Sequence, residues 1–335
     1  MVKGKQNKKY RYPFVSICTP TFNRRPFFPA LIECFNSQDY PKDRMEWIII
    51  DDGTDKIEDL VSDIPQVKYF KYDKQLLLGK KRNISNEKSR GDIIVYMDDD
   101  DYYCPTRVSH AVQMLKLHPK ALCAGGSRQL IYFSHISKLY ELGPYSEQHA
   151  TAGTFAFRRK LLDITSFSDE QGLAEEKHFL KNYTIPFVQL DYKQTSLMFS
   201  HRHNTYDKRK MLDNNSDKYV KPSKLRLEDI IKKENKRDFY INKIDQLLVD
   251  YTPGEPTMKP EVLKQQEEMH KRLAQNKPTR PVFNLQRPDG TAEAFDPEDI
   301  IKILNDKENT IISLKEEIAR KEKEIFALKT QLKKA

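Results

Sequence analysis

The sequence predicts an α/β domain with a mainly parallel sheet that is covered by helices on both faces. Short, β-branched apolar runs at residues 14–19, 47–50 and 93–97 have the length and composition of buried strands. Each run ends on polar residues, and segments with helical spacing of apolar residues lie between the runs. Strands that alternate with helices in this way favour parallel pairing, because each connection crosses a face of the sheet.

The predicted elements follow one another with short connections. Residues 14–19 predict the first strand, and residues 26–38 predict a helix with one apolar face. Residues 47–50 and 67–72 predict two further strands, and a polar helix begins at residue 78. This helix leads into the central strand.

The central strand ends on four consecutive aspartates, residues 98–101. Adjacent like charges repel, and a divalent cation such as Mn²⁺ or Mg²⁺ would relieve that repulsion. Alternate side chains of an extended segment share a face, so Asp98 and Asp100 are expected to converge on one ion while Asp99 points elsewhere. The alternative is an acidic start to the helix that follows Pro105, but one or two acids would serve that purpose.

Composition limits the possible classes of protein. The chain has 335 residues with 17 Phe and 17 Tyr, enough for one sizeable domain with an appendage. Its net charge of +9 is not arranged as a basic stripe with interleaved aromatics, so we expect no nucleic-acid partner. The four cysteines show no paired spacing and predict reduced core thiols. With no signal sequence or membrane-spanning segment visible, we expect a soluble, cytoplasmic protein.

Four motifs in order carry a resemblance to a known family. They are VSICTPTFNR at residues 15–24, IIDDGT at 49–54, GKKRN at 79–83 and YMDDDD at 96–101. Together they resemble the inverting family 2 glycosyltransferases of the GT-A fold, over about residues 13–205. The resemblance implies transfer of a sugar from a nucleoside-diphosphate sugar, expected to be a UDP-sugar, to an acceptor hydroxyl. The acceptor class stays open among glycans, glycolipids and proteins.

The resemblance also implies roles for individual residues. The nucleotide sugar would be held by the loop after the first strand, by the second acid of the Asp-Asp-Gly motif, by the basic helix and by the first acids of the aspartate run. These residues are Pro20, Thr21, Phe22, Asn23, Asp52, Lys81, Arg82, Asp98 and Asp99. The metal ion would be held by Asp98 and Asp100. For the lysines of the basic helix, an ordinary solvated helix face is an equal alternative.

The acceptor half of the domain is expected to supply the general base. Residues 151–159 resemble the family's acceptor-side loop and strand, with Gly153 and Thr154 at the acceptor. Glu175 and Glu176 occupy the position of the family's catalytic acid, although this chain has Glu where Asp is usual. Position by position, Glu176 is the better match and Glu175 is close behind. Either could deprotonate the acceptor hydroxyl, because adjacent acids raise each other's proton affinity. An acidic helix start is the alternative.

A histidine pair follows a strand predicted at residues 195–199. His201 matches the family's position for a ligand of the metal or diphosphate, and His203 is the weaker candidate. An ordinary surface histidine is the alternative reading of either residue.

The sequence as a whole predicts a chain of four parts. A basic arm at residues 1–12 precedes the transferase domain at 13–210, and a helical, Pro-rich connector spans 211–297. Residues 298–335 predict a coiled coil that joins two or three copies of the chain, although two lysines weaken its seam. The apolar residues of the seam are Ile311, Leu314, Ile318, Ile325, Leu328 and Leu332. A single helix folded onto the domain is the alternative.

Two other functions compete with transfer of a sugar. One is an inactive transferase-like scaffold, which would have no need of repelling acids such as Asp98, Asp100 and Glu176. The other is a sugar nucleotidyltransferase, which would need a glycine-rich phosphate loop after the first strand. Residues 20–25 contain no glycine.

Overall fold

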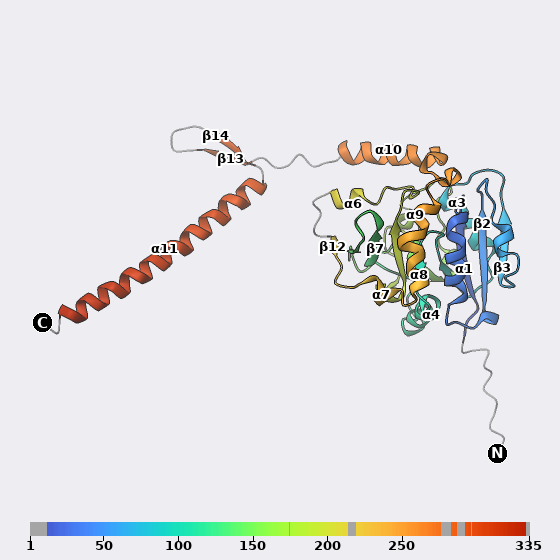
Figure 1. The fold of residues 1–335 in the computed structure, drawn as a ribbon, viewed down its shortest axis with the longest axis horizontal. Coiled ribbons are helices and arrows are strands. Elements are labelled where there is room, and N and C mark those ends of the chain that lie inside the picture. The colour runs from blue at the N-terminus through green and yellow to red at the C-terminus, as the bar shows by residue number, and fades with distance from the viewer. Residues whose placement is uncertain are drawn as a thin grey trace, which may run out of the picture. The chain divides into compact units, whose positions relative to one another are not determined.

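The computed structural model describes residues 12–173, 175–213, 219–275, 283–286, 292–295 and 297–332. The chain divides into two compact units, Met1–Glu267 and Glu268–Ala335 (Figure 1). Apart from Tyr12, the basic arm predicted at residues 1–12 lies outside the described residues, so it stays a prediction.

The first unit is built on a seven-stranded sheet in the order β10-β6-β9-β4-β1-β2-β3. The strands β3, β2, β1 and β4 are parallel, whereas β9 runs antiparallel to both β4 and β6. The predicted mixed, mainly parallel sheet of the GT-A class is therefore confirmed. Its strands are β1 Val15–Thr21, β2 Met45–Asp51, β3 Val67–Lys71, β4 Ile93–Tyr96, β6 Cys123–Gly125, β9 Ala156–Arg158 and β10 Phe187–Gln189.

Helices cover both faces of this sheet because successive side chains of a strand point to opposite faces. One face, which includes Ile17 and Trp47, packs against α1 (Phe28–Asn36) and α4 (Arg107–Leu117). The other face, which includes Cys18, packs with α3 (Leu78–Lys88) and a group of phenylalanines. All four cysteines are buried and free, as the sequence predicted.

A second, five-stranded sheet has the order β12-β8-β7-β11-β5. Of its strands, the sequence predicted β11, at residues 195–199. The two-residue strand β5 follows the aspartates directly and pairs antiparallel with β11. This pairing brings the aspartate run next to the residues that follow β11. The strands are β5 Tyr102–Tyr103, β7 Gln129–Phe133, β8 Lys138–Leu142, β11 Ser196–Ser200 and β12 Val220–Pro222.

The compact unit continues well past residue 210, where the sequence placed the end of the domain. Ile244 and Leu248 bury Phe27 in a separate apolar cluster, and the Tyr240 ring stacks on Phe199 with centroids 4.2 Å apart. In Figure 1, α8 and α9 run beside α1. These packing contacts place the end of the unit at Glu267. The helices of this region are α7 Leu227–Ile230, α8 Glu234–Asp238, the π-helix η8 Phe239–Lys243, α9 Ile244–Leu247 and α10 Pro260–Gln275.

Short helices complete the first unit. Several of them sit in the loops at the sheet edge that carries the site. They are η2 Arg25–Phe27, η3 Lys42–Arg44, α2 Glu58–Val61, η4 Ser134–Ile136, η5 Ala152–Thr154, η6 Arg159–Asp163, α5 Glu176–Phe179, η7 Tyr192–Gln194, α6 Lys210–Asp213, η9 Thr252–Gly254 and η10 Pro256–Met258.

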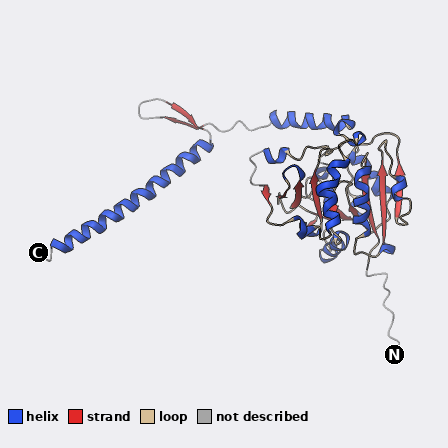
Figure 2. Cartoon of the chain, in the orientation of Figure 1, coloured by secondary structure: helices blue, strands red, loops and turns tan. Residues whose placement is uncertain are grey.

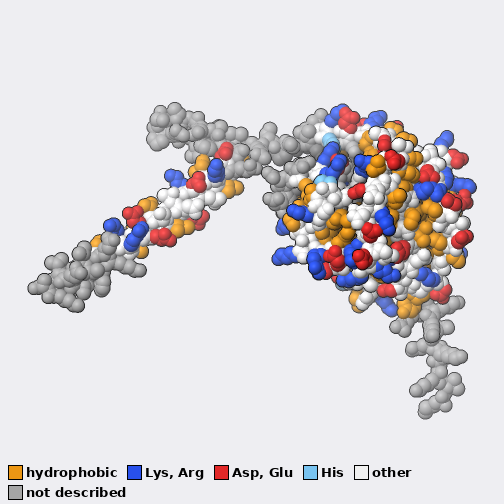
Figure 3. Space-filling view, viewed as in Figure 1, with side chains coloured by type: hydrophobic (Ala, Val, Ile, Leu, Met, Phe, Trp, Pro, Cys, Tyr) orange, Lys and Arg blue, Asp and Glu red, His pale blue; other side chains and the backbone are white. Residues whose placement is uncertain are grey.

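The second unit contains a hairpin and one long helix (Figure 2). Strands β13 (Phe283–Gln286) and β14 (Ala292–Phe295) pair antiparallel inside the segment predicted as a loose connector. The predicted terminal helix is present as α11, Pro297–Leu332, with 36 residues. Apolar side chains are exposed along it (Figure 3). None of the helices described has the length and apolar character needed to cross a bilayer.

Truncation tests where the folded unit ends. A chain cut after residue 267 should unfold in one transition at the temperature of the same unit in the full chain. A chain cut after residue 210 loses the partners of Phe27 and Phe199, each buried apolar side chain being worth about 1.5–3 kcal/mol. That loss approaches the roughly 5–15 kcal/mol of a whole domain, so the shorter chain should not fold cooperatively. Equal melting temperatures for the two truncations, measured by circular dichroism, would contradict this boundary.

Candidate active site

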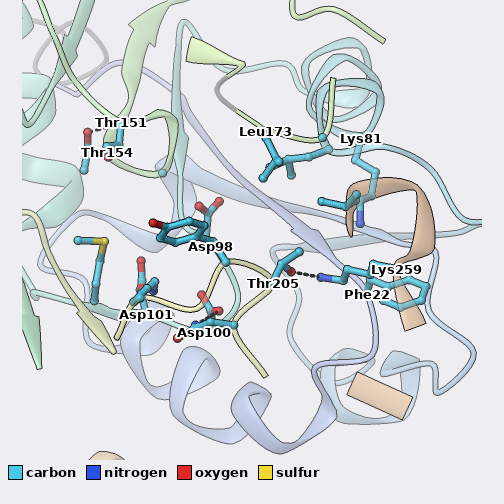
Figure 4. A pocket seen from close by; sticks show the side chains of 18 of the residues that line it. Phe22, Lys81, Asp98, Asp100, Asp101, Thr151, Thr154, Leu173, Thr205 and Lys259 are labelled. Atoms are coloured by element: carbon cyan, nitrogen blue, oxygen red, sulfur yellow. Dashed lines mark hydrogen bonds between the residues drawn. The ribbon is translucent and has the colours of Figure 1, made fainter. Parts of the chain in front are cut away.

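A cavity of about 320 Å³ opens at the carboxyl ends of β1 and β4. Six residues that the sequence assigned to the site line it: Phe22, Lys81, Asp98, Asp100, Gly153 and Thr154 (Figure 4). The other predicted site residues lie outside this lining; they are Pro20, Thr21, Asn23, Asp52, Arg82, Asp99, Glu175, Glu176 and His201.

Asp52 and Lys81 form a buried ion pair behind the cavity. Lys81 Nζ lies 2.8 Å from Asp52 Oδ1 and also donates to the Thr21 carbonyl at 3.2 Å. The Leu76 backbone N–H donates to the other carboxylate oxygen at 2.6 Å. Lys81 is therefore not part of a solvated helix face, because its charge is fixed beside the Phe22 ring at 5.8 Å from the centroid.

Asn23 shapes the loop after β1 rather than facing the cavity. Its φ of 52° is left-handed, a conformation that asparagine tolerates better than most residues. The side chain accepts from the Asp55 N–H at 2.9 Å and donates to the Pro253 carbonyl at 2.7 Å. Gly53 must be a glycine here, since a Cβ would stand 2.5 Å from the Asn23 nitrogen.

Arg24 is a buried cation of this loop that the sequence reasoning did not single out. It donates to the carbonyls of Gly254 and His203 at 2.9 and 2.7 Å. Its Nε lies 3.8 Å from Asp99 Oδ1, so Asp99 points away from the other aspartates, as predicted. Burial raises the pKa of Asp99 to about 6, although Arg24 opposes that shift.

Arg82 joins the aspartate run to the predicted catalytic acids. The side chain is 1% exposed, and its Nε donates to Glu175 Oε1 at 3.0 Å. Its two terminal nitrogens donate to the two oxygens of Asp98 at 3.2 and 3.3 Å. The guanidinium also lies over the Tyr96 ring, 4.6 Å from the centroid. Although burial opposes it, the charges of Asp98 and Glu175 raise the pKa of Arg82, which stays protonated.

Asp100 is held by residues that follow β11. Its Oδ2 lies 3.2 Å from His201 Nε2 and 3.4 Å from Asn204 Nδ2. Burial works against ionisation of this carboxyl, but the His201 hydrogen bond and nearby Lys208 lower its pKa well below the usual range. Burial lowers the pKa of His201 to about 4, so the ring is neutral near pH 7. His203 instead lies beside Tyr251, with ring centroids 6.1 Å apart.

The donor atoms at this position fit a hard divalent cation. Asp100 Oδ2 and His201 Nε2 are close enough to share one coordination sphere, and both are ligand types that Mn²⁺ accepts. Asp101 Oδ1 is buried next to them and has no hydrogen-bond partner in the described part of the chain. Asp98 departs from the prediction, because it is turned to Arg82 rather than to Asp100. The described residues accordingly include no group of three or more acidic, histidine or cysteine ligands around a single point.

Gly153 and Thr154 form the wall opposite the aspartates. A Cβ at Gly153 would stand 2.5 Å from Asp98 Oδ2, so only glycine leaves room for that carboxylate. Thr154 has a structural role, since its hydroxyl donates to the Thr151 carbonyl and accepts from the Gly126 N–H. The buried Arg107, which the sequence reasoning missed, binds the carbonyls of Thr154 and Phe155 at 2.8 and 2.9 Å.

The two glutamates are distinguished by their surroundings. Glu175 is buried and bound to Arg82, which stabilises its charged form. Glu176 begins α5 and is partly buried. Burial, reinforced by the adjacent charge of Glu175, raises the pKa of Glu176 to about 7. A carboxyl that titrates near neutral pH is suited to accept a proton, whereas an arginine-bound carboxylate is not.

Lys259 is a cavity residue that lies far from any recognised motif. It follows η10, and its Nζ donates to the Thr205 hydroxyl at 3.1 Å (Figure 4). The sequence placed this segment in a connector, because nothing in its composition signals a return to the sheet edge.

Comparison with known proteins places this site in a family. Residues 16–164, which hold the strands β1, β2 and β4 and the aspartate run, match the profile of Glycosyl transferase family 2. This part of the chain is a family 2 glycosyltransferase domain. The domain is 26% identical over 116 residues to the poly(ribitol-phosphate) β-N-acetylglucosaminyltransferase TarS of Staphylococcus aureus, matching 31% of this chain and 19% of TarS. An uncharacterised glycosyltransferase of Haemophilus influenzae is 32% identical over 113 residues, or 32% of this chain and 44% of that protein. The chain thus spans less than half of either relative.

Solved structures resemble the domain more distantly. TarS of S. aureus in complex with UDP-GlcNAc aligns at a TM-score of 0.43 and 20% identity, over 56% of this chain and 58% of that one. The mannosyltransferase PcManGT of Pyrobaculum calidifontis, in complex with GDP-Man and Mn²⁺, aligns at 0.47 and 14% identity, over 80% and 82%.

Replacing Arg82 tests its role as the central cation. Arg82→Met should lower the free energy of unfolding by about 3–5 kcal/mol, because Glu175 and Asp98 lose a buried partner. Lys80→Met, two positions earlier on α3, breaks the exposed Lys80–Asp169 pair and should leave the free energy of unfolding nearly unchanged. Urea titration measures both values, and equal costs would show that the Arg82 pairs are no stronger than a surface contact.

Proposed function

We propose that this chain transfers a sugar from a nucleoside-diphosphate sugar, expected to be a UDP-sugar, to an acceptor hydroxyl with inversion. One observation carries the proposal. A single cavity is lined by Phe22, Lys81, Asp98 and Asp100, which come from three separate motifs of a family 2 domain, and by Gly153 of the predicted acceptor-side loop.

The donor would lie along the edge formed by the loops after β1, β2 and β4. Phe22 offers a ring for the base or ribose, and Lys81 is fixed beside it by Asp52. Asp100 and His201 would hold Mn²⁺ or Mg²⁺, and Asp98 would join them on release from Arg82. A divalent cation there would neutralise the charge that develops on the leaving diphosphate.

Glu176 would act as the general base. In an inverting transfer, the acceptor oxygen attacks the anomeric carbon while its proton passes to a carboxylate on the acceptor side. Glu176 has the pKa for that step, and Glu175 holds Arg82 in place next to it. The acceptor would approach along Gly153, where the backbone stands closest to Asp98. A glycan, glycolipid or protein hydroxyl remains the expected acceptor class.

The long helix α11 would join copies of the enzyme. Leu304, Ile311, Leu314, Ile318 and Ile325 recur at steps of three, four and seven residues and are at least half exposed. A second copy of α11 would cover this stripe in a parallel coiled coil of two or three chains.

The function is tested first by activity. We expect metal-dependent hydrolysis of one nucleotide sugar in a panel of UDP- and GDP-sugars, measured as released nucleoside diphosphate. Retained binding without any hydrolysis or transfer would instead support the inactive scaffold.

The pH dependence tests the base. Because Glu176 is active only when deprotonated, kcat should rise with pH through about 7 and level off above it. Glu176→Gln should lower kcat by about 10²–10⁴-fold, abolish the rise of kcat with pH and leave donor affinity unchanged. If Glu175→Gln alone abolishes the rise of kcat with pH, the two glutamates have exchanged roles.

The effect of Mn²⁺ on UDP binding tests whether Asp100 holds a metal ion. Asp100→Asn keeps the shape of the side chain but loses the charge, so Mn²⁺ should no longer strengthen UDP binding in calorimetry. Asp169→Asn, an exposed acid outside the cavity, is the matched control and should retain the full effect of Mn²⁺. An unchanged effect of Mn²⁺ in Asp100→Asn would remove the metal assignment.

Charge placed in the seam tests the association of α11. Ile318→Glu should convert an oligomer to monomers in sedimentation experiments at tens of micromolar. Ala319→Glu adds the same charge to the next position of the helix, away from the seam, and should leave the oligomer intact. A wild-type chain that sediments as a monomer would refute the coiled coil.

A further inference from the structure

Residues 251–266, here called the C-terminal strap, are bound to the loop that follows β1. The strap carbonyls of Pro253 and Gly254 accept hydrogen bonds from the side chains of Asn23 and Arg24 in this loop. The Tyr251 hydroxyl also donates to Asp55 Oδ2, in the loop after β2, at 2.8 Å. Gly254 lies so close that a Cβ would stand 2.7 Å from the Asn23 carbonyl oxygen. The strap is therefore fitted to this loop, although it lies outside the part of the chain that matches the family profile.

The other end of the strap binds the two loops across the cavity. Gln265 accepts from the Gly172 N–H at 2.9 Å and donates to the Glu170 carbonyl at 2.9 Å. Gln266 donates to the Thr205 carbonyl at 2.9 Å, and Val262 lines the cavity itself. The strap thus ties together the loops after β1, before α5 and after β11, which enclose the proposed donor site.

Lys259, near the middle of the strap, carries an ammonium group into the cavity. Its Nζ lies 5.5 Å from the centre of the Phe22 ring and 3.1 Å from the Thr205 hydroxyl (Figure 4). Asp98 and Asp100 line the same cavity. Lys259 therefore stands between the ring proposed for the base or ribose and the aspartates proposed for the metal.

Lys259 differs from the other cations of the site in its partners. Lys81 is paired with Asp52 at 2.8 Å, and Arg82 with Glu175 and Asp98. The Lys208 ammonium group donates a hydrogen bond to the Phe199 backbone carbonyl at 3.0 Å. In the described part of the chain, the Lys259 ammonium donates one hydrogen bond, to a neutral hydroxyl, and lies over the Phe22 ring, but no carboxylate forms an ion pair with it. Burial, with the nearby charges of Arg24 and Lys81, lowers the pKa of Lys259 to about 7, so an anion bound beside it would favour the protonated form. In that form the ammonium group has two hydrogens to spare and is suited to bind an anion.

We infer that Lys259 binds the diphosphate of the donor, so the strap supplies a catalytic residue from outside the family domain. This inference rests on the proposed function. When the acceptor oxygen bonds to the anomeric carbon, the bond from that carbon to the phosphate oxygen breaks. Its electron pair stays on the diphosphate, and the acceptor proton goes to Glu176. Lys259 would stabilise the added negative charge by donating a hydrogen bond to the leaving phosphate.

Binding of UDP, pyrophosphate and uridine to the full-length protein with Mn²⁺ tests the assignment. Lys259→Met should weaken the binding of UDP and pyrophosphate by about 10–100-fold, the effect of losing a hydrogen bond to a charged group. Uridine binding should change by less than about twofold, since its base and ribose do not contact the ammonium group. In turnover, kcat should fall as well as donor affinity, because the leaving group carries the most charge in the transition state.

Two control variants separate the charge from the fold. Lys264→Met removes an exposed lysine of α10, the helix that begins directly after Lys259, and should leave all three affinities unchanged. Lys259→Arg keeps the charge and should restore most of the affinity for UDP. A loss of affinity in Lys259→Met together with an unchanged melting temperature would exclude unfolding as the cause.

The outcomes distinguish this inference from the function on which it rests. If the wild type binds UDP and Lys259→Met binds it equally well, the Lys259 assignment is wrong and the proposed function stands. If the wild type binds pyrophosphate through Lys259 but no nucleoside diphosphate or sugar nucleotide, the anion site is correct and the proposed function is wrong. If uridine binding falls as much as UDP binding, Lys259 only shapes the pocket and the inference fails.

Discussion

The site depends on one buried cation, the guanidinium of Arg82. Four consecutive aspartates after β4 would repel one another, and Glu175 and Glu176 add two more acids nearby. Arg82 binds Asp98 with two nitrogens and Glu175 with the third, so one planar group orients acids from two separate segments. Its fork geometry matches carboxylates in a way that the point charge of a lysine cannot. The aspartates and the acceptor-side acids are therefore positioned together.

The remaining acids are each assigned a different partner. Asp100 turns to His201, Asp99 to Arg24 and Asp52 to Lys81. These partners come from the loop after β1, from α3 and from the turn after β11, and the β5–β11 pairing brings the last of them into reach. Within this arrangement Asp101 Oδ1 is buried without a hydrogen-bond partner in the described residues, and the pKa of Glu176 is raised to about 7. The binding and proton transfer proposed above would use these two groups separately.

Much of the first half of the domain was predictable from the sequence. Residues 14–19, 47–50 and 93–97 are short apolar runs with β-branched residues, and each forms a strand of the sheet because no other structure buries so short a run on both sides. Phe22, Lys81, Asp98, Asp100 and Gly153 were also identified, since each belongs to a local motif. The second sheet was missed, because β7 and β8 carry no alternation distinct from other partly buried segments. The roles of Asn23, Asp52 and Thr154 in holding loops also depend on partners that are distant in sequence.

The sequence by itself determined the order of strands and helices, the run of acids at a strand end and the family of the domain, because those features are local patterns of residue type. Only the tertiary structure decided that Asp98 binds Arg82 and that Arg24 and Arg107 are buried. It also decided that the unit extends to Glu267 and returns Lys259 to the cavity. The physical reason is that an ion pair or a packed contact joins residues far apart in the chain, as Asn23 and Pro253 are joined. Such pairs leave no periodic or compositional signal in either segment.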